Sequence, residues 1–179
     1  FPLSSTMLKI TFDEKLEETI PAAKNFILTP PLIVSAVSFY DETLKEITLQ
    51  LQNELTGGVL YSLHCEKMYD CSGNIIQKDF SSFSFALPEK PAPGDIIINE
   101  ILFNPKPLGV DFVEVYNHSS KFFNLKNWLM ANAAADSIEN KRIVTTEDFL
   151  LEPGRYIVFT NDPVTLKGEY IAGVEENFL

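Results

Sequence analysis

The chain has 179 residues, of which 45% are hydrophobic and 12% aromatic, a composition that can bury a core and is not that of a disordered segment. Its 14 Lys and Arg against 25 Asp and Glu give a net charge of −11, and no basic cluster interrupts this acidity, so nucleic-acid binding is disfavoured. No apolar run reaches the roughly 18 residues of a membrane span, and no secretory signal opens the chain. Because it begins Phe1-Pro2-Leu3 without an initiating Met, we expect it to be a piece of a longer protein.

The first half of the chain predicts an antiparallel β-sandwich over residues 1–88. Short β-prone runs, several alternating apolar and polar residues, recur about every ten residues with almost no helical periodicity. The predicted strands are Leu8–Phe12, Asn25–Leu28, Ile33–Tyr40, Leu44–Leu51, Leu60–Cys65 and Phe80–Leu87. The segments ITFDEKL, NFIL, VSFYDETLKEITLQL, TGGVLYSLHC and DCSGN, in this order, resemble bacterial immunoglobulin-like domains, which occur as tandem modules in surface proteins.

Two cysteines, Cys65 and Cys71, flank a five-residue stretch that is short enough to be closed by a disulfide. Free thiols and a metal site are the alternatives. The metal site is the weakest of these, because His64 points to the opposite face of its strand from Cys65 and His118 is far along the chain. A disulfide predicts a location outside the cytoplasm.

The DCSGN segment between the fifth and sixth strands predicts a tight turn. Asp70 at its start can accept hydrogen bonds from the following backbone, and Gly73 and Asn74 tolerate a positive φ. A calcium loop using Asp70 and Asn74 is the alternative.

A Pro-rich segment at residues 89–94, with Pro88 just before it, predicts an extended, semi-rigid linker to a second domain at residues 95–179. Ile96 to Phe103 is apolar on both alternating faces, which predicts a strand buried on both sides over part of its length, or shielded by the neighbouring domain. Further strands are expected at residues 112–116, 142–145 and 155–160, with a loop or short helical turn at residues 131–141.

Four ordered motifs in this half resemble the lamin tail domain: INEILFNP, DFVEVYNHSS, the Leu125 to Trp128 segment and FLLEPGRYIVFTND. The resemblance implies a second immunoglobulin-like sandwich, of a kind known from nuclear lamins and from bacterial extracytoplasmic proteins. Such domains normally continue for further strands, so we expect this sandwich to be C-terminally incomplete. An open edge carrying Ile171, Val174, Phe178 and Leu179 would then be covered by another copy or by the first domain.

Four polar residues around the first two strands of this half form a candidate calcium site: Asn99, Glu100, Asp111 and Glu114. Paired strands could bring the glutamates together, and carboxylate and amide oxygens are calcium ligands. Structural roles in strands and turns are the favoured alternative.

Three aromatic residues form a candidate glycan-stacking set: Trp128, Tyr116 and Tyr156. For Trp128, a place in the core is the favoured alternative, because a large aromatic fills the space between sheets.

No HExxH, GxSxG, P-loop or dinucleotide motif occurs, so the sequence predicts no enzyme and no cofactor, with Ca²⁺ as the only alternative. The fold class predicted is all-β, with two immunoglobulin-like antiparallel sandwiches in tandem. We expect a non-catalytic interaction or spacer fragment of a larger bacterial surface or periplasmic protein, serving docking or adhesion to protein or cell-surface partners. The alternatives are a glycan-binding module and an accessory module of a secreted hydrolase or nuclease.

Overall fold

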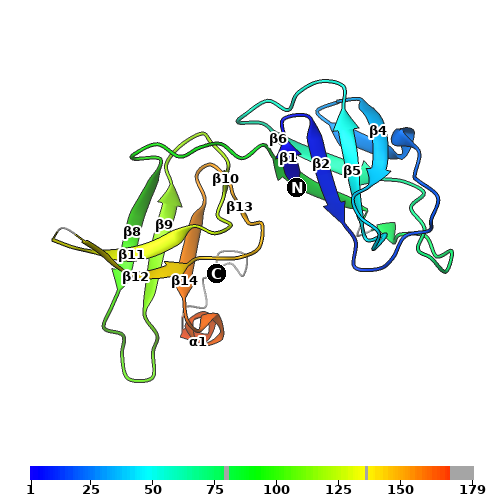
Figure 1. The fold of residues 1–179 in the computed structure, drawn as a ribbon. Helices are drawn as coiled ribbons and strands as arrows, with labels where there is room; N and C mark the ends of the chain where they lie inside the picture. Colours follow the sequence, from blue (N-terminus) through cyan, green and yellow to red (C-terminus); the bar gives the residue numbers. More distant parts are fainter. Residues whose placement is uncertain (79–80, 136, 170–179) are drawn as a thin grey trace. The chain divides into compact units, whose positions relative to one another are not determined.

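The computed structural model describes residues 1–78, 81–135 and 137–169. It divides into two compact units, Phe1–Leu87 and Pro88–Leu179. All strand pairs named below are antiparallel, which confirms the predicted all-β class (Figure 1).

The first unit packs a four-stranded sheet, β1-β2-β5-β4, against a three-stranded sheet, β3-β6-β7. Its elements are β1 (Pro2–Ser4), β2 (Met7–Thr11), a 3-10 turn (Ala23–Asn25), β3 (Phe26–Thr29), β4 (Val34–Phe39), β5 (Glu46–Leu51), β6 (Leu60–Cys65) and β7 (Ser82–Ala86). Alternate residues of β5 and β6, including Ile47, Leu49 and Leu63, are completely buried between the sheets. The period-2 pattern therefore located this core correctly.

The predicted disulfide is absent, because the two cysteines have different environments. Cys65 ends β6 opposite Phe26 and points into the core, where burial raises the pKa of its thiol to about 12. Cys71 is exposed on the DCSGN turn. Both are free thiols, so the disulfide gives no support to an extracytoplasmic location.

The DCSGN segment is the tight turn that the sequence predicts. The Asp70 carboxylate accepts hydrogen bonds from the backbone N–H groups of Ser72 and Asn74, both at 2.8 Å, and from the Asn74 side-chain amide at 2.7 Å. The hydrogen bonds from Asn74 hold the pKa of Asp70 below its ordinary value. Gly73 has a φ of +85°, which glycine adopts without strain. Both Asp70 carboxylate oxygens thus serve the turn itself.

The second unit has a three-stranded sheet, β14-β9-β8, and two smaller two-stranded sheets, β10-β13 and β11-β12. Its elements are β8 (Ile96–Leu102), β9 (Phe112–Asn117), β10 (Phe123–Asn124), β11 (Leu129–Ala134), β12 (Ser137–Ile143), β13 (Leu150–Leu151), β14 (Tyr156–Thr160) and α1 (Pro163–Glu169). The predicted open edge at residues 171–179 lies outside the described residues.

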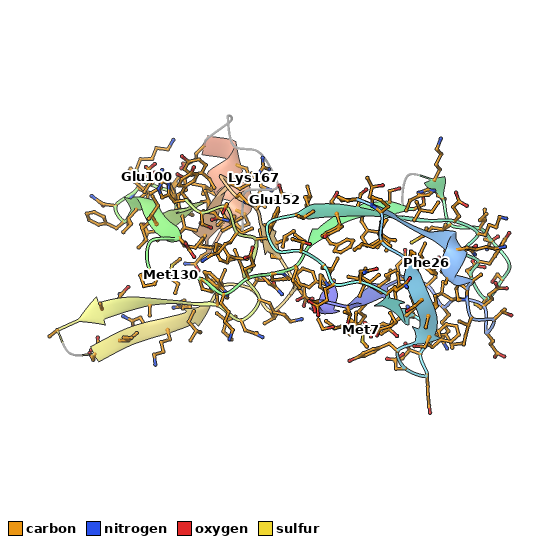
Figure 2. The ribbon with its side chains drawn as sticks, turned by 90° about the horizontal axis from the view of Figure 1, so that it is seen from above. Met7, Phe26, Glu100, Met130, Glu152 and Lys167 are labelled. Atoms are coloured by element: carbon orange, nitrogen blue, oxygen red, sulfur yellow. The ribbon has the colours of Figure 1, made fainter. Side chains whose placement is uncertain are left out.

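Two predictions for this unit are wrong. The segment at residues 131–141 is not a loop or helical turn, because most of its described residues belong to β11 and β12, two paired strands that extend away from the sheet in both views (Figures 1 and 2). β8 is not buried on both sides, because it is an edge strand whose Ile98 and Ile101 are exposed. Its apolar residues are therefore available at the surface of the second unit.

The segment predicted as a linker is largely held by the second unit. The N–H of Glu89 donates to the carbonyl of Phe122 at 2.8 Å, and the N–H of Ala92 donates to the carboxylate of Asp95 at 2.7 Å. Lys121 Nζ also lies 2.7 Å from this carboxylate, and its hydrogen bond holds the pKa of Asp95 below the ordinary value. Hydrogen bonds thus fix this Pro-rich stretch to the second unit, at Phe122 and at Asp95 just before β8.

The buried side chain of Asn117 joins the end of β9 to the turn that follows it and to the end of β13. Its side-chain nitrogen donates to the carbonyls of Lys121 at 2.8 Å, Glu152 at 3.0 Å and Leu151 at 3.3 Å. Its side-chain oxygen accepts from the N–H of Ser119 at 3.1 Å and from the hydroxyl of Ser119 at 2.8 Å. Asn117 is the last residue of β9, and it is completely buried.

Candidate interaction site

The register of the β14-β9-β8 sheet divides its residues between two faces. Val115 and Ile157 pair with each other and point into a core that also contains Phe123. Tyr116 and Tyr156 also pair with each other, and they point to the opposite, outer face because side chains alternate along a strand.

The short helix α1 covers one end of the outer face. Leu166 is completely buried against Phe112 of β9 and Val158 of β14. The N-terminus of the helix is capped by Asp162, whose carboxylate accepts hydrogen bonds from the N–H of Thr165 at 3.0 Å and from its hydroxyl at 2.6 Å. The sequence does not predict this helix. At the other end of the outer face, within the described parts of the chain, Tyr156 is 41% exposed.

The open end carries a row of three side chains across the sheet, Ile97, Tyr116 and Tyr156. The two tyrosine rings are stacked, with centroids 4.5 Å apart and an interplanar angle of 29°. The His118 ring lies 5.9 Å from that of Tyr116. Ile97 and Tyr156 are 39% and 41% exposed, so this row is an accessible apolar and aromatic strip.

The adjacent row places Glu100 directly opposite Glu114, and the side-chain amide of Asn99 donates to Glu114 Oε1 at 2.6 Å. Three members of the predicted calcium set thus lie together. Asp111 does not join them, since it precedes β9 at a position that alternation assigns to the other face, and it lines a groove there. Within the described ranges, no group of three or more His, Cys, Asp and Glu is arranged to hold a metal ion.

Trp128 lies apart from the two tyrosines. It is half-buried against the core, and its ring centroid is 6.0 Å from that of Phe123. The predicted glycan-stacking set therefore divides into a tyrosine pair on the outer face and a tryptophan that packs on the core.

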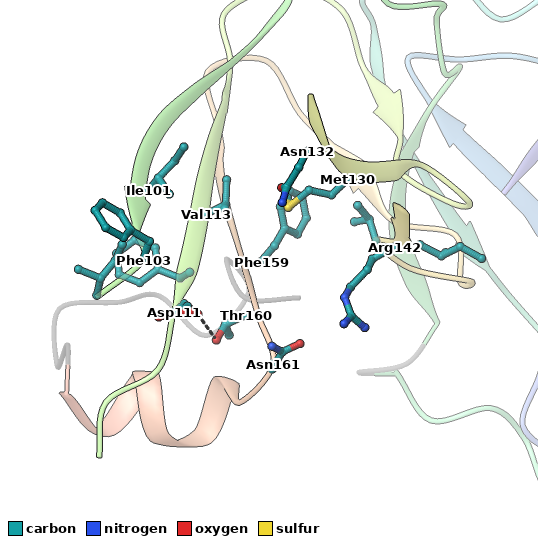
Figure 3. Close-up of a pocket in the computed structure, with 14 residues that line it drawn as sticks. Ile101, Phe103, Asp111, Val113, Met130, Asn132, Arg142, Phe159, Thr160 and Asn161 are labelled. Carbon is teal, nitrogen blue, oxygen red and sulfur yellow. Dashed lines mark hydrogen bonds between the residues drawn. The ribbon is translucent and has the colours of Figure 1, made fainter. Parts of the chain in front are cut away.

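A groove of about 460 Å³ lies between the inner face of the sheet and the β11-β12 hairpin, near the C-terminal end of β8. Figure 3 shows Val113 and Phe159 of the sheet and Met130, Asn132 and Arg142 of the hairpin around it. We call it the hairpin groove, and its lining residues are Ile101, Leu102, Phe103, Asp111, Phe112, Val113, Met130, Asn132, Arg142, Ile143, Val144, Phe159, Thr160 and Asn161.

Large exposed hydrophobic residues border the hairpin groove. On the β8 side these are Ile101 and Phe103, and Phe103 is 81% exposed. On the hairpin side Ile143 is 55% exposed. Such an exposed apolar surface with polar groups at its rim is characteristic of interaction sites. These residues can be read from the sequence, but their proximity cannot, because it depends on where the β11-β12 hairpin lies.

An arrangement that sequence inspection misses joins β6 and β7 of the first unit. His64 Nδ1 lies 2.8 Å from the hydroxyl of Ser82, and His64 Nε2 lies 4.0 Å from a carboxylate oxygen of Glu66. The second distance exceeds the hydrogen-bond length with which an acid orients a catalytic histidine. These three side chains also lie outside the hairpin groove.

Together these features define a two-unit, antiparallel β protein whose second unit presents two accessible surfaces, the hairpin groove and the outer tyrosine row. No helix in the described part of the chain is long and apolar enough to cross a membrane.

Residues 89–177, just under half of the chain, match the family model described as Lamin Tail Domain. This confirms the resemblance found in the four motifs of the second half.

The comparison with solved structures gives two structures of surface-layer protein. One is surface layer protein SbsC, domains 1–6, with 24% identity, 54% of this chain and 14% of that chain covered, and a TM-score of 0.42. The other is the S-layer protein rSbsC, with 14% identity, 88% and 31% covered, and a TM-score of 0.44. Both scores are too low to establish a shared fold, and the chain spans less than a third of either structure's length. No curated protein matches the chain.

Proposed function

We propose that the chain is a non-catalytic interaction segment of a larger bacterial surface or periplasmic protein, and that its lamin tail domain docks a partner protein through the hairpin groove. The observation that carries this proposal is the set of exposed apolar residues where β8 and the β11-β12 hairpin meet. The extracytoplasmic location rests on the kinship of this domain with bacterial lamin tail domains.

The composition of the groove suits a protein partner. Met130, Phe103 and Ile143 offer adaptable and aromatic contact area, and Arg142 supplies a planar hydrogen-bond donor. Asn132 and Asn161 add polar groups on either side. Apolar contact surrounded by polar groups gives a protein interface both affinity and orientation.

The non-catalytic part of the proposal rests on what the described residues lack. They hold no cluster of three acidic, thiol or imidazole groups suited to a metal ion, and the Ser82–His64–Glu66 arrangement lacks a close acid. The same docking role would serve an accessory module attached to a secreted hydrolase or nuclease, in which case the parent gene also encodes a catalytic domain.

The test compares two exposed isoleucines. Ile143 in the hairpin groove is 55% exposed and Ile75 in the first unit is 56% exposed, so Ile143→Ser and Ile75→Ser remove similar exposed apolar area. We expect Ile143→Ser, alone and with Phe103→Ser, to reduce retention of the purified chain on cell-envelope preparations from its source, while Ile75→Ser does not. Equal retention of all variants would refute docking through the groove.

The same apolar surface could instead bind a second copy of the chain. Sedimentation of the wild-type chain and of Ile143→Ser distinguishes it, because a dimer formed through the groove dissociates in the variant, whereas docking to a different protein leaves a monomer in both cases.

A further inference from the structure

We propose that the open end of the outer face of the β14-β9-β8 sheet is a binding site for a neutral carbohydrate chain. The site, called the tyrosine face below, consists of Ile97, Glu100, Glu114, Tyr116 and Tyr156. It lies on the opposite side of the sheet from the hairpin groove, so this proposal does not depend on protein docking.

The first argument is the exposed aromatic pair. Tyr116 and Tyr156 stack at 4.5 Å across neighbouring strands, yet Tyr156 remains 41% exposed and neither ring enters the core clusters. Helix α1 covers Phe112 and Val158 further along the same face but leaves this pair open. A tyrosine combines an apolar ring with a polar hydroxyl, and this matches a sugar, whose C–H faces are apolar and whose rim is polar.

The second argument is the hydrogen-bonding character of the adjacent row. Glu100 and Glu114 lie directly opposite each other, and like charges in a cross-strand pair destabilise a sheet. Ionised carboxylates accept hydrogen bonds but cannot donate them, so a hydroxyl-rich ligand satisfies both. Asn99 donates to Glu114 at 2.6 Å and fixes the orientation of that carboxylate. Hydrogen bonds from sugar hydroxyls would thus offset the repulsion between Glu100 and Glu114 that is present without a ligand.

The third argument is charge. The second half of the chain, from Glu89, has eight Lys and Arg against fourteen Asp and Glu, a net charge of 8 − 14 = −6. An anionic polysaccharide would be repelled by this surface and by the glutamate pair in particular. A flat apolar protein surface would bury both carboxylates without offering them partners of its own, which is costly. An uncharged polyol is not repelled by the negative charge, and its hydroxyls can hydrogen-bond to the carboxylates.

The size of the row sets the size of the ligand. Neighbouring strands lie about 4.8 Å apart, so Ile97, Tyr116 and Tyr156 span about 10 Å across the sheet. The row runs to β14, an outer strand of this sheet, so that a chain can extend past Tyr156 into solvent. We therefore infer a short stretch of a linear or branched glycan as the ligand.

The test is native affinity electrophoresis of the chain through gels containing neutral polysaccharides, namely hydroxyethylcellulose, xylan, laminarin and mannan. We expect at least one of them to retard the wild type, and Tyr156→Ala to weaken the derived affinity by about tenfold, the loss of one aromatic contact. Tyr156→Phe keeps the ring and should retain most of the affinity, and Glu114→Gln should weaken it. Ile75→Ser is the matched control on the first unit.

Two results overturn the proposal: no retardation by any of the four polysaccharides, or retardation that is the same for wild type, Tyr156→Ala and Glu114→Gln. Trp128 emission confirms that the Tyr156 and Glu114 variants are folded, and Glu114→Gln keeps the test decisive if Tyr156→Ala is unstable. Protein docking is read separately by the envelope assay with Ile143→Ser, so failure of either proposal leaves the other standing.

Discussion

Removing the side chain of Asn117 should destabilise the second domain more than any other single polar substitution within it. Asn117→Ala deletes five side-chain hydrogen bonds, three donated to backbone carbonyls and two accepted from Ser119. With a net value of about 1 kcal/mol for a typical bond and less for the 3.3 Å contact to Leu151, the loss is about 3–5 kcal/mol. Such a loss is a large part of the 5–15 kcal/mol that stabilises a typical domain.

The assay is urea unfolding followed by tryptophan fluorescence. Trp128 is the only tryptophan in the chain and packs on Phe123, so its emission reports on the second domain alone. With a urea dependence of about 2 kcal/mol per molar, we expect the midpoint to fall by about 2 M. Asn117→Asp keeps the shape but turns a carboxylate toward three carbonyls, and it should be at least as destabilising at neutral pH.

The control is Asn104→Ala, which truncates an exposed asparagine in the same domain. Its midpoint should stay close to that of the wild type. If Asn117→Ala shifts the midpoint no further than Asn104→Ala does, the idea that the Asn117 side chain holds the end of β9 to β13 is wrong.

The remaining predictions concern thiols, the helix, acid and calcium. In the native chain at pH 8, a thiol reagent should label the exposed Cys71 but not Cys65, whose pKa is about 12, and both should react in denaturant, as counted by mass spectrometry. Leu166→Ala should cost about 2–4 kcal/mol in the same urea assay, since this side chain is completely buried. The pKa of Asp95 is depressed by Lys121, so their contribution to stability is fully present above the unfolded-state value of about 3.9 and is lost as pH falls through the folded-state value. Lys121→Met should therefore flatten the acid side of the pH–stability curve. Calcium and a chelator should give the same melting temperature, and a rise with calcium would revive the predicted cation site.

The sequence predicts strands well where burial alternates. Ile47 and Leu49 of β5 show the period of two because one face meets a core, and alternation is what sequence inspection detects. It predicts β11 and β12 poorly, because their residues are polar, Ala-rich or exposed and the strands are held by pairing with each other. Propensity carries little information about such a hairpin.

The candidate site residues could be picked from the sequence by their chemistry, but their positions in the fold could not. Tyr116 and Tyr156 meet because β9 and β14 pair in one particular register, which the sequence does not reveal. Trp128 has the same chemistry but lies against the core. For β8, apolar residues on both alternating faces predicted burial, yet the strand is at a sheet edge, because hydrophobicity shows what a strand can bury and not what covers it.

The hydrogen bonds of the Pro-rich segment also have a mechanical consequence. When the chain is pulled from its N-terminal side, the load enters the second domain at Glu89 and passes to Phe122 before it reaches β8. The Asp95–Lys121 ion pair and the bond from Ala92 then resist the peeling of residues 89–95 from the domain. This stretch thus acts as a latch that must open before β8 is pulled from β9, and its opening would lengthen the chain under load without unfolding the domain.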